Sequence, residues 1–230
     1  MKKTALILLL LLCASAEAKI TKQTVNHAWQ RISQADGFPR VPIHYEADND
    51  PNAWVRWQDA ENFTVHVTEG LMTILNSDAE IAGVLGHELG HIKLGHYNNM
   101  LLTDTARAIM TANLDRTDDL AQAVGSIDIE LRESKFSREQ ETEADDYGVS
   151  LLKKAGYDVW GLYNAMKRFD TNGYATEQNG FNSHPASRER LSHLALMARS
   201  SKSSREETSN EYSNKVKYDV DDIASALMGR

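Results

Sequence analysis

His87 and His91 stand four residues apart with Glu88 between them, which gives the pattern HExxH. In a helix, residues four apart lie one turn apart on the same face, so both imidazoles can point at one metal ion. The side chain of Glu88 leaves the helix about 100° away from that of His87, so it can reach a water at the metal without binding the metal itself. The spacing therefore predicts a metal centre at which Glu88 carries protons.

The segment around this pattern is predicted to be a helix between Ser77 and Gly95. Ser77 and Glu80 have the spacing of a capping box, and Gly95 stands where a helix commonly stops. Five apolar residues recur at helical spacing on one face: Ile81, Val84, Leu85, Leu89 and Ile92. The two histidines fall at the border of this apolar face, so we expect them to point away from solvent.

Three glycines, at positions 83, 86 and 90, form a further stripe along the same predicted helix. Each costs about 1 kcal/mol of helix stability relative to alanine. Such a cost is understandable where a second backbone packs closely against the helix. The stripe therefore predicts a close neighbour on this side.

A zinc site on this helix needs a third protein ligand. The metzincin pattern would place a histidine at position 97 and a glycine at position 94, but the chain has Tyr97 and Leu94. His96 is one residue out of register. We expect His96 to be a surface residue at the helix end, where histidine suits the helix dipole.

The acidic segment 137–146 supplies a better candidate for the third ligand. On a helical wheel, Glu141 and Asp145 share a side with the apolar residues, whereas the other acids face water: Glu139, Glu143 and Asp146. Buried carboxylates need a cation or strong donors. Glu141 as a metal ligand, with Asp145 accepting the outer N–H of a ligand histidine, meets both needs. Alternatively, both acids pair with Arg138 or Arg188.

His184 is the third element that could take part in chemistry. Pro185 is typical of the first position of a helix, so His184 would lie at a helix N-terminus. An imidazole there could donate to a developing oxyanion or cover the metal. The alternative is an ordinary residue of the cap region.

The composition is that of a soluble globular chain, with 41% hydrophobic and 25% charged residues, which excludes collagen-like and wholly disordered proteins. Thirty-three acids against 25 Lys and Arg leave a net charge of −8, so nucleic acid is not an expected partner. Cys13 is the single cysteine. Any metal must therefore be held by histidine and carboxylate.

Residues 1–18 are predicted to be a signal peptide, because two lysines, a short leucine run and an A-x-A ending follow one another. We expect cleavage after Ala18, with Ala16 as the competing site and an uncleaved membrane anchor as the alternative. The chain that remains has no apolar run of membrane-spanning length. Residues 19–199 are expected to form one domain, and the Ser- and Glu-rich residues 200–230 a flexible tail with a possible short helix.

The predicted fold class is α+β and mostly helical, with a small sheet beside the HExxH helix. Residues 22–35 are expected to form the first helix, and three short strands are expected at 39–45, 54–57 and 63–67. From Leu71 onward the chain is helical in period, apart from a loop near residues 171–183. No internal repeat is evident.

Three segments in this order resemble the HtpX-like and CAAX prenyl endopeptidase family of zinc metallopeptidases, which are HExxH gluzincins. They are GVLGHELGHIKLGH (83–96), FSREQETEADDYGVSLL (136–152) and HPASRERL (184–191). The resemblance covers roughly residues 50–195 and is greatest to periplasmic and outer-membrane members from Gram-negative bacteria. It implies a single zincin-like domain.

The resemblance also implies one zinc ion per chain with three protein ligands: His87, His91 and Glu141. Glu88 would be the general base and acid, and Asp145 would support a ligand. His184 would lie near the active site, with Arg190 holding its segment. A strand like Phe63–Val67 would pair with the backbone of an extended polypeptide substrate.

The chain departs from the family in lacking both transmembrane helices and the lipid-attachment cysteine of some outer-membrane members. We therefore expect an exported, periplasmic zinc endopeptidase that acts on soluble or misfolded envelope proteins in protein quality control. The alternative is a latent or chaperone-like envelope binding factor whose zinc site is covered by His184. A serine hydrolase is excluded, because no G-x-S-x-G pattern is present. Oligomeric state leaves no signal in the sequence.

Overall fold

The computed structural model describes residues 20–39, 41–57, 62–99, 129–130, 136–174, 184 and 187–201. The predicted signal peptide, Pro185 and the tail beyond residue 201 lie outside these ranges. Within them, no helix is both long and apolar enough to cross a membrane.

Four strands form one small sheet in the order β1-β3-β2-β4. Their bounds are Ile43–Glu46 (β1), Ala53–Trp57 (β2), Phe63–Thr68 (β3) and Ile129–Glu130 (β4). β1 runs parallel to β3, whereas β2 runs antiparallel to both of its neighbours. β3 is therefore an interior strand with both sides paired. The expectation that strand 63–67 pairs with substrate is wrong, because β1 already occupies its free side.

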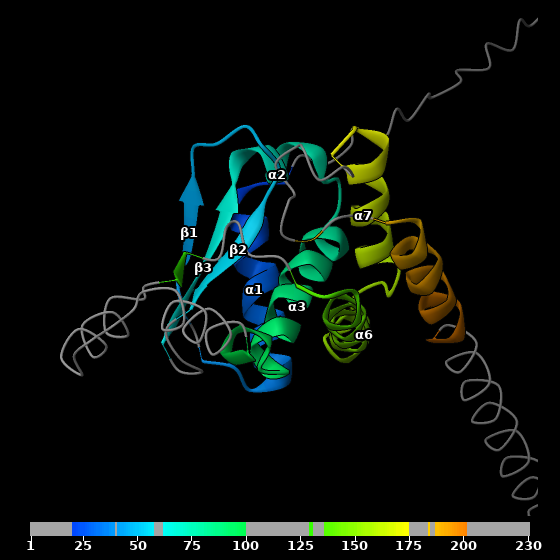
Figure 1. Cartoon of the computed structure of the whole chain (residues 1–230). Helices are drawn as coiled ribbons and strands as arrows, with labels where there is room; N and C mark the ends of the chain where they lie inside the picture. Colours follow the sequence, from blue (N-terminus) through cyan, green and yellow to red (C-terminus); the bar gives the residue numbers. More distant parts are fainter. Residues whose placement is uncertain are drawn as a thin grey trace, which may run out of the picture.

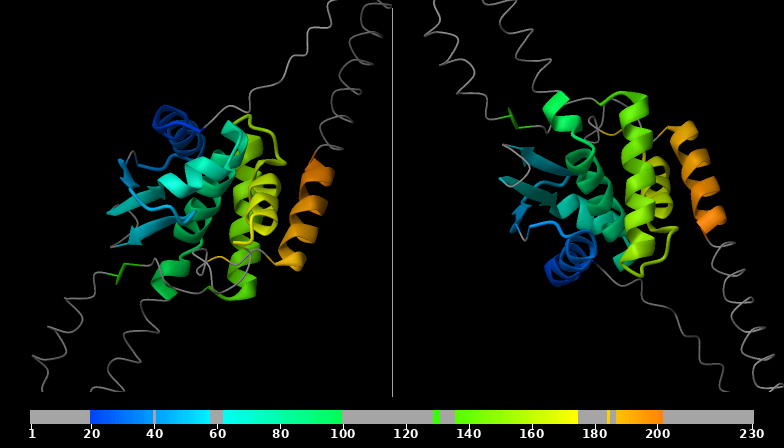
Figure 2. Two further views of the ribbon diagram at one scale, coloured as in Figure 1. Left: turned by 90° about the horizontal axis from the view of Figure 1, so that it is seen from above. Right: turned by 90° about the horizontal axis from the view of Figure 1, so that it is seen from below.

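Among the described residues, the helices are α1 (Lys22–Asp36), α2 (Glu69–Ile74), α3 (Asp78–Lys93), α6 (Arg138–Lys154), α7 (Gly161–Thr171) and a last helix over residues 188–201, and residues 96–99 are also helical. α3 runs through the middle of the molecule, with the sheet on one side and α6 and α7 on the other (Figure 1). Figure 2 shows the last helix as an outer layer beside α6 and α7. A mostly helical α+β domain with a small sheet beside the HExxH helix is confirmed.

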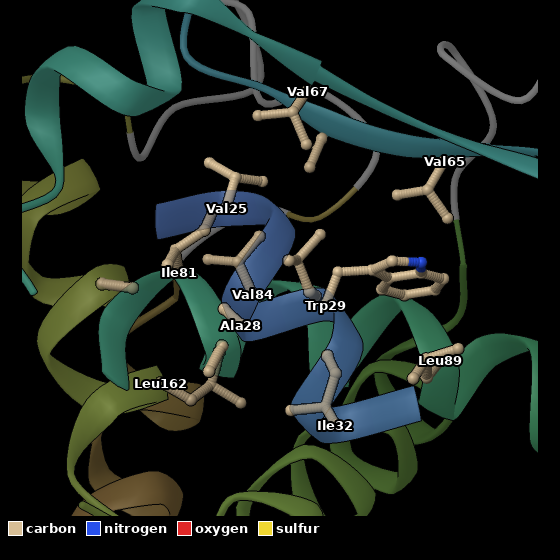
Figure 3. Packing of buried hydrophobic residues seen from close by; sticks show 14 of the residues in the cluster. Val25, Ala28, Trp29, Ile32, Val65, Val67, Ile81, Val84, Leu89 and Leu162 are labelled. Atoms are coloured by element: carbon tan, nitrogen blue, oxygen red, sulfur yellow. The ribbon is translucent and has the colours of Figure 1, made fainter. Parts of the chain in front are cut away.

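The main core lies between the sheet, α1 and α3 (Figure 3). β3 alternates between buried and half-buried residues and presents Val65 and Val67 to this core. α1 buries Ala28 and Trp29 against them, and the indole N–H of Trp29 donates to the carbonyl of Val41 at 2.8 Å. Periodic apolar residues of β3, α1 and α3 thus meet in one core.

Both ends of α3 lie where the sequence predicts them. The Ser77 hydroxyl accepts from the backbone N–H of Glu80 at 3.2 Å, and Gly95 has a φ of 72° in the left-handed region. The second hydrogen bond of a capping box, from the backbone N–H of Ser77 to the side chain of Glu80, is replaced by other contacts of Glu80. The Glu80 carboxylate accepts from the backbone of Asn76 at 2.7 Å and from Arg168 of α7 at 2.8 Å, so it joins α3 to α7 instead.

The glycine stripe of α3 is packed against other backbones, as predicted. A methyl group at Gly83 would lie 2.6 Å from the backbone nitrogen of Leu162 on α7. At Gly90 it would lie 3.0 Å from Cα of Ala144 on α6, whereas at Gly86 the nearest atom would be 3.5 Å away. The glycines therefore set the distance between α3 and its two neighbours.

Replacing Gly83 with alanine is expected to lower the free energy of unfolding by about 1–3 kcal/mol, because the new methyl group overlaps the backbone of α7. Gly86→Ala is the matched control on the same helix. It should leave stability unchanged or raise it by up to about 1 kcal/mol, since alanine is the better helix former. Denaturant unfolding followed by circular dichroism measures both. Equal stability of the two variants would contradict the close approach of α3 and α7.

Candidate metal centre

Three histidines and one glutamate bring their ligand atoms together, all within 4.8 Å of one another and all buried. His87 and His91 come from α3, and their Nε2 atoms lie 3.0 Å apart. Glu141 comes from α6, with carboxylate oxygens 3.5 Å from Nε2 of His87 and 3.6 Å from Nε2 of His91. Nδ1 of His184 lies 2.8 Å from Glu141 and 3.1 Å from His87. The structure thus unites the three predicted ligands and adds His184.

Glu88 lies beside this cluster and is 1% exposed. Its Oε2 accepts a hydrogen bond from the hydroxyl of Tyr97 at 3.2 Å, while its Oε1 lies 3.4 Å from Nε2 of His184. Burial and the nearby Glu88 raise the pKa of Tyr97 well above its usual value, so the hydroxyl remains a donor. Tyr97 therefore fixes one carboxylate oxygen and leaves the other facing the cluster.

Arg190, from the last helix, joins the two inward-facing carboxylates of α6. One guanidinium nitrogen lies 2.6 Å from Oε2 of Glu141, and two others bind Asp145 at 2.7 and 2.9 Å. These acids pair with Arg190 rather than with Arg138 or Arg188. Burial alone would raise the pKa of both carboxyls, but Arg190 holds that of Asp145 well below its usual value, and His184 with Arg190 lowers that of Glu141. Both acids are therefore ionised at neutral pH.

The ionised Asp145 determines which nitrogen of His87 carries the proton. Nδ1 of His87 lies 3.0 Å from Oδ1 of Asp145. Because an ionised carboxylate only accepts, we assign the proton to Nδ1, which leaves the lone pair of Nε2 facing the cluster. Burial, with His87 and His184 nearby, lowers the pKa of His91 well below its usual value. His91 is thus neutral, which is the form of imidazole that binds metal.

The charges around the cluster fit a divalent cation. Among the described residues, three buried carboxylates, those of Glu88, Glu141 and Asp145, lie near one buried guanidinium, that of Arg190, so acidic groups outnumber it. Burial alone would lower the pKa of His184, but Glu141 and Glu88 raise it above its usual value. Imidazole nitrogens with one carboxylate are typical ligands of catalytic zinc. The residues present therefore fit zinc.

His96 is buried, with 2% of its surface exposed, so the expectation of a surface residue is wrong. The positive φ of Gly95 turns the chain back after α3, and Nδ1 of His96 comes to lie 2.9 Å from Nδ1 of His91. Nε2 of His96 lies 3.1 Å from Glu143, whose side chain is otherwise 62% exposed. A helical wheel applies only within one helix, so it cannot predict the position of His96, which follows the turn after α3.

Two aromatic residues of the site carry no signal in the sequence analysis. The ring of Phe136 stacks on that of His91, with centroids 3.8 Å apart and planes at 21°, and also lies 5.3 Å from the ring of His184. In the sequence, Tyr97 stands where the metzincin pattern has a histidine, which predicts no role for its hydroxyl. Phe136 precedes α6 and Tyr97 follows the turn at Gly95, so helical periodicity reaches neither of them.

Comparison with known proteins agrees with this geometry. The model of peptidase family M48 matches residues 19–198. The chain is 36% identical over 188 residues to the metalloprotease YcaL of Escherichia coli (strain K12), covering 79% of this chain and 71% of that protein. It is 32% identical over 195 residues to the metalloprotease LoiP of the same organism, covering 79% and 75%. A protease HtpX homolog of Thermococcus sibiricus is 29% identical over 166 residues, covering 60% and 54%.

The chain belongs to peptidase family M48, as the resemblance of its three segments predicts. It is a zinc metalloendopeptidase, and its substrates are accordingly polypeptides. The zinc cofactor expected from the sequence is confirmed by the family and by the cluster of four donors.

Proposed function

We propose that this chain is an exported endopeptidase that cleaves soluble or misfolded proteins of the bacterial envelope. In this proposal His87, His91 and Glu141 hold the zinc, Glu88 is the general base, and residues 19–199 form the mature peptidase domain. The supporting observation is the buried carboxylate of Glu88 beside a cluster of donors that fits zinc. Export is supported by the order of charged, apolar and small residues in positions 1–18.

When bound, zinc supplies a Lewis acid that polarises the scissile carbonyl and lowers the pKa of water. Glu88 takes the proton of the attacking water and then delivers it to the leaving amine. Its Oε1, on the side of His184, is the oxygen available for this transfer, because Tyr97 holds Oε2. Asp145 keeps His87 in the tautomer that ligates, and Arg190 keeps Asp145 ionised.

We propose that the polypeptide substrate binds in an extended form, which allows recognition of its backbone with little preference for sequence.

A second candidate function is a latent or chaperone-like binding factor. The observation in its favour is the position of His184, whose Nδ1 lies among the ligand atoms of His87 and Glu141 rather than outside them. A fourth protein ligand would occupy the position that catalytic zinc sites keep open. His184 would then hold the peptidase inactive until its segment moves.

Glu88→Gln is expected to keep one zinc per chain and to lower the rate of casein cleavage by about 10²–10⁴-fold. The amide keeps the size of the side chain and an oxygen for Tyr97, but it cannot take a proton from water. Zinc analysis and cleavage should be measured on the same preparation. Glu139→Gln, an exposed acid on α6, is the control and should cleave at the wild-type rate. Wild-type cleavage by Glu88→Gln would assign the base elsewhere.

His184→Ala is expected to raise the rate of casein cleavage several-fold, because it removes a side chain that lies among the ligand atoms. The control is His193→Ala, on the last helix, whose ring pairs with Asp146 outside the cluster. A fall in cleavage with zinc retained would instead make His184 a donor to the developing oxyanion. If neither wild type nor His184→Ala cleaves while both hold zinc, the binding factor is the better account.

A further inference from the structure

We propose that His96 and Glu143 act as a positioning pair that holds His91 in the orientation and tautomer that present its Nε2 to zinc. The inference rests on the proposed role of His91 as a ligand. His96 touches no reacting group, so it acts only through His91. Glu143 completes the pair from α6.

The pair forms a continuous line of contacts from the ligand to solvent. Nδ1 of His91 lies 2.9 Å from Nδ1 of His96, and Nε2 of His96 lies 3.1 Å from Oε2 of Glu143. Both histidines are buried, with 0% and 2% of their surfaces exposed, whereas the Glu143 side chain reaches water. In the part of the chain that the structure describes, the outer nitrogen of His91 contacts no carboxylate like the one that Asp145 offers to His87, and His96 occupies that position.

The direction of the hydrogen bonds follows from the outer end of this line. The carboxylate of Glu143 accepts, so the proton of a neutral His96 belongs on Nε2, and Nδ1 of His96 keeps a lone pair. That lone pair can only accept from Nδ1–H of His91. Nε2 of His91, 3.0 Å from Nε2 of His87, then carries the lone pair that a metal ion requires. The opposite order would place a proton on Nε2 of His91 and block the site.

The surrounding residues fix the remaining freedom of the His91 ring. Phe136 stacks on one face of the ring at 3.8 Å, which restricts rotation of the plane but does not select a tautomer. The left-handed Gly95 returns the chain so that His96 reaches the outer nitrogen. α6 supplies Glu143 two residues after Glu141, so one helix carries both a ligand and the far end of the pair. Selection of the tautomer is thus left to His96.

The test is the zinc dissociation constant (Kd) of the full chain, measured by competition with a chelator. His96→Leu fills the space but removes the acceptor, and it is expected to weaken zinc binding about 10–100-fold. His96→Asn keeps an acceptor oxygen near the position of Nδ1 and should recover most of that loss. Glu143→Gln can donate as well as accept, so it should give a smaller loss. Glu139→Gln, on the exposed side of α6, is the control without effect.

A second readout is the ¹⁵N spectrum of the histidines in the zinc-loaded wild type, where His91 should be protonated on Nδ1 and metal-bound through Nε2. The unfolding temperatures of the zinc-free variants show whether they are folded. If His96→Leu is unfolded, the zinc Kd values of His96→Asn and Glu143→Gln are compared with that of the wild type instead. An unchanged Kd for His96→Leu in a chain that binds zinc and cleaves casein would overturn this inference and leave the proposed function standing. Equal losses for His96→Leu and His96→Asn would also overturn it. A wild type that binds no zinc would overturn both.

Discussion

Arg190 binds Glu141 and Asp145 at the same time, and the chemistry of the cluster depends on this contact. Two carboxylates four residues apart on α6, with Glu88 close by, would be costly to bury together without a cation, since removing one partner of a buried ion pair costs about 3–5 kcal/mol. The guanidinium keeps Asp145 ionised, and Asp145 in turn holds the proton on Nδ1 of His87. Arg190 of the last helix thus keeps Asp145 of α6 ionised, and through Asp145 it leaves the lone pair of His87 on Nε2, facing the cluster.

Close packing of α3 and α6 brings the ligand atoms within reach of one another. Gly90, next to His91, lies against the backbone of Ala144, next to Asp145. On the other helix, a methyl group at Gly148 would lie 3.2 Å from the backbone nitrogen of His87. Gly90 and Ala144 are therefore sequence neighbours of residues of the site, and Gly148 packs against one. The same packing that stabilises the helix pair sets the separation at which two histidines and a glutamate can share one ion.

Local periodicity is sufficient to predict α3, both of its ends, and the inward direction of Glu141 and Asp145, because these depend on the geometry of one helix at a time. Periodicity does not predict the strand order, since the parallel pairing of β1 with β3 joins segments about twenty residues apart. It also fails for His96, which lies beyond a left-handed turn. The ion pairs of Arg190 with Glu141 and Asp145 are not predicted either, because they join helices distant in sequence, and the resemblance implies only that Arg190 holds the segment of His184.

The central claim is that His87, His91 and Glu141 together hold one zinc ion, and the zinc content of Glu141→Ala after dialysis tests it most directly. Wild type and the exposed control Glu139→Ala should each retain one zinc per chain. Glu141→Ala should lose it, with Kd raised more than about 100-fold, since even the loss of a residue behind a ligand costs about 10–100-fold. Full zinc occupancy in Glu141→Ala would contradict the account and move the third ligand to His184, whose Nδ1 lies among the ligand atoms.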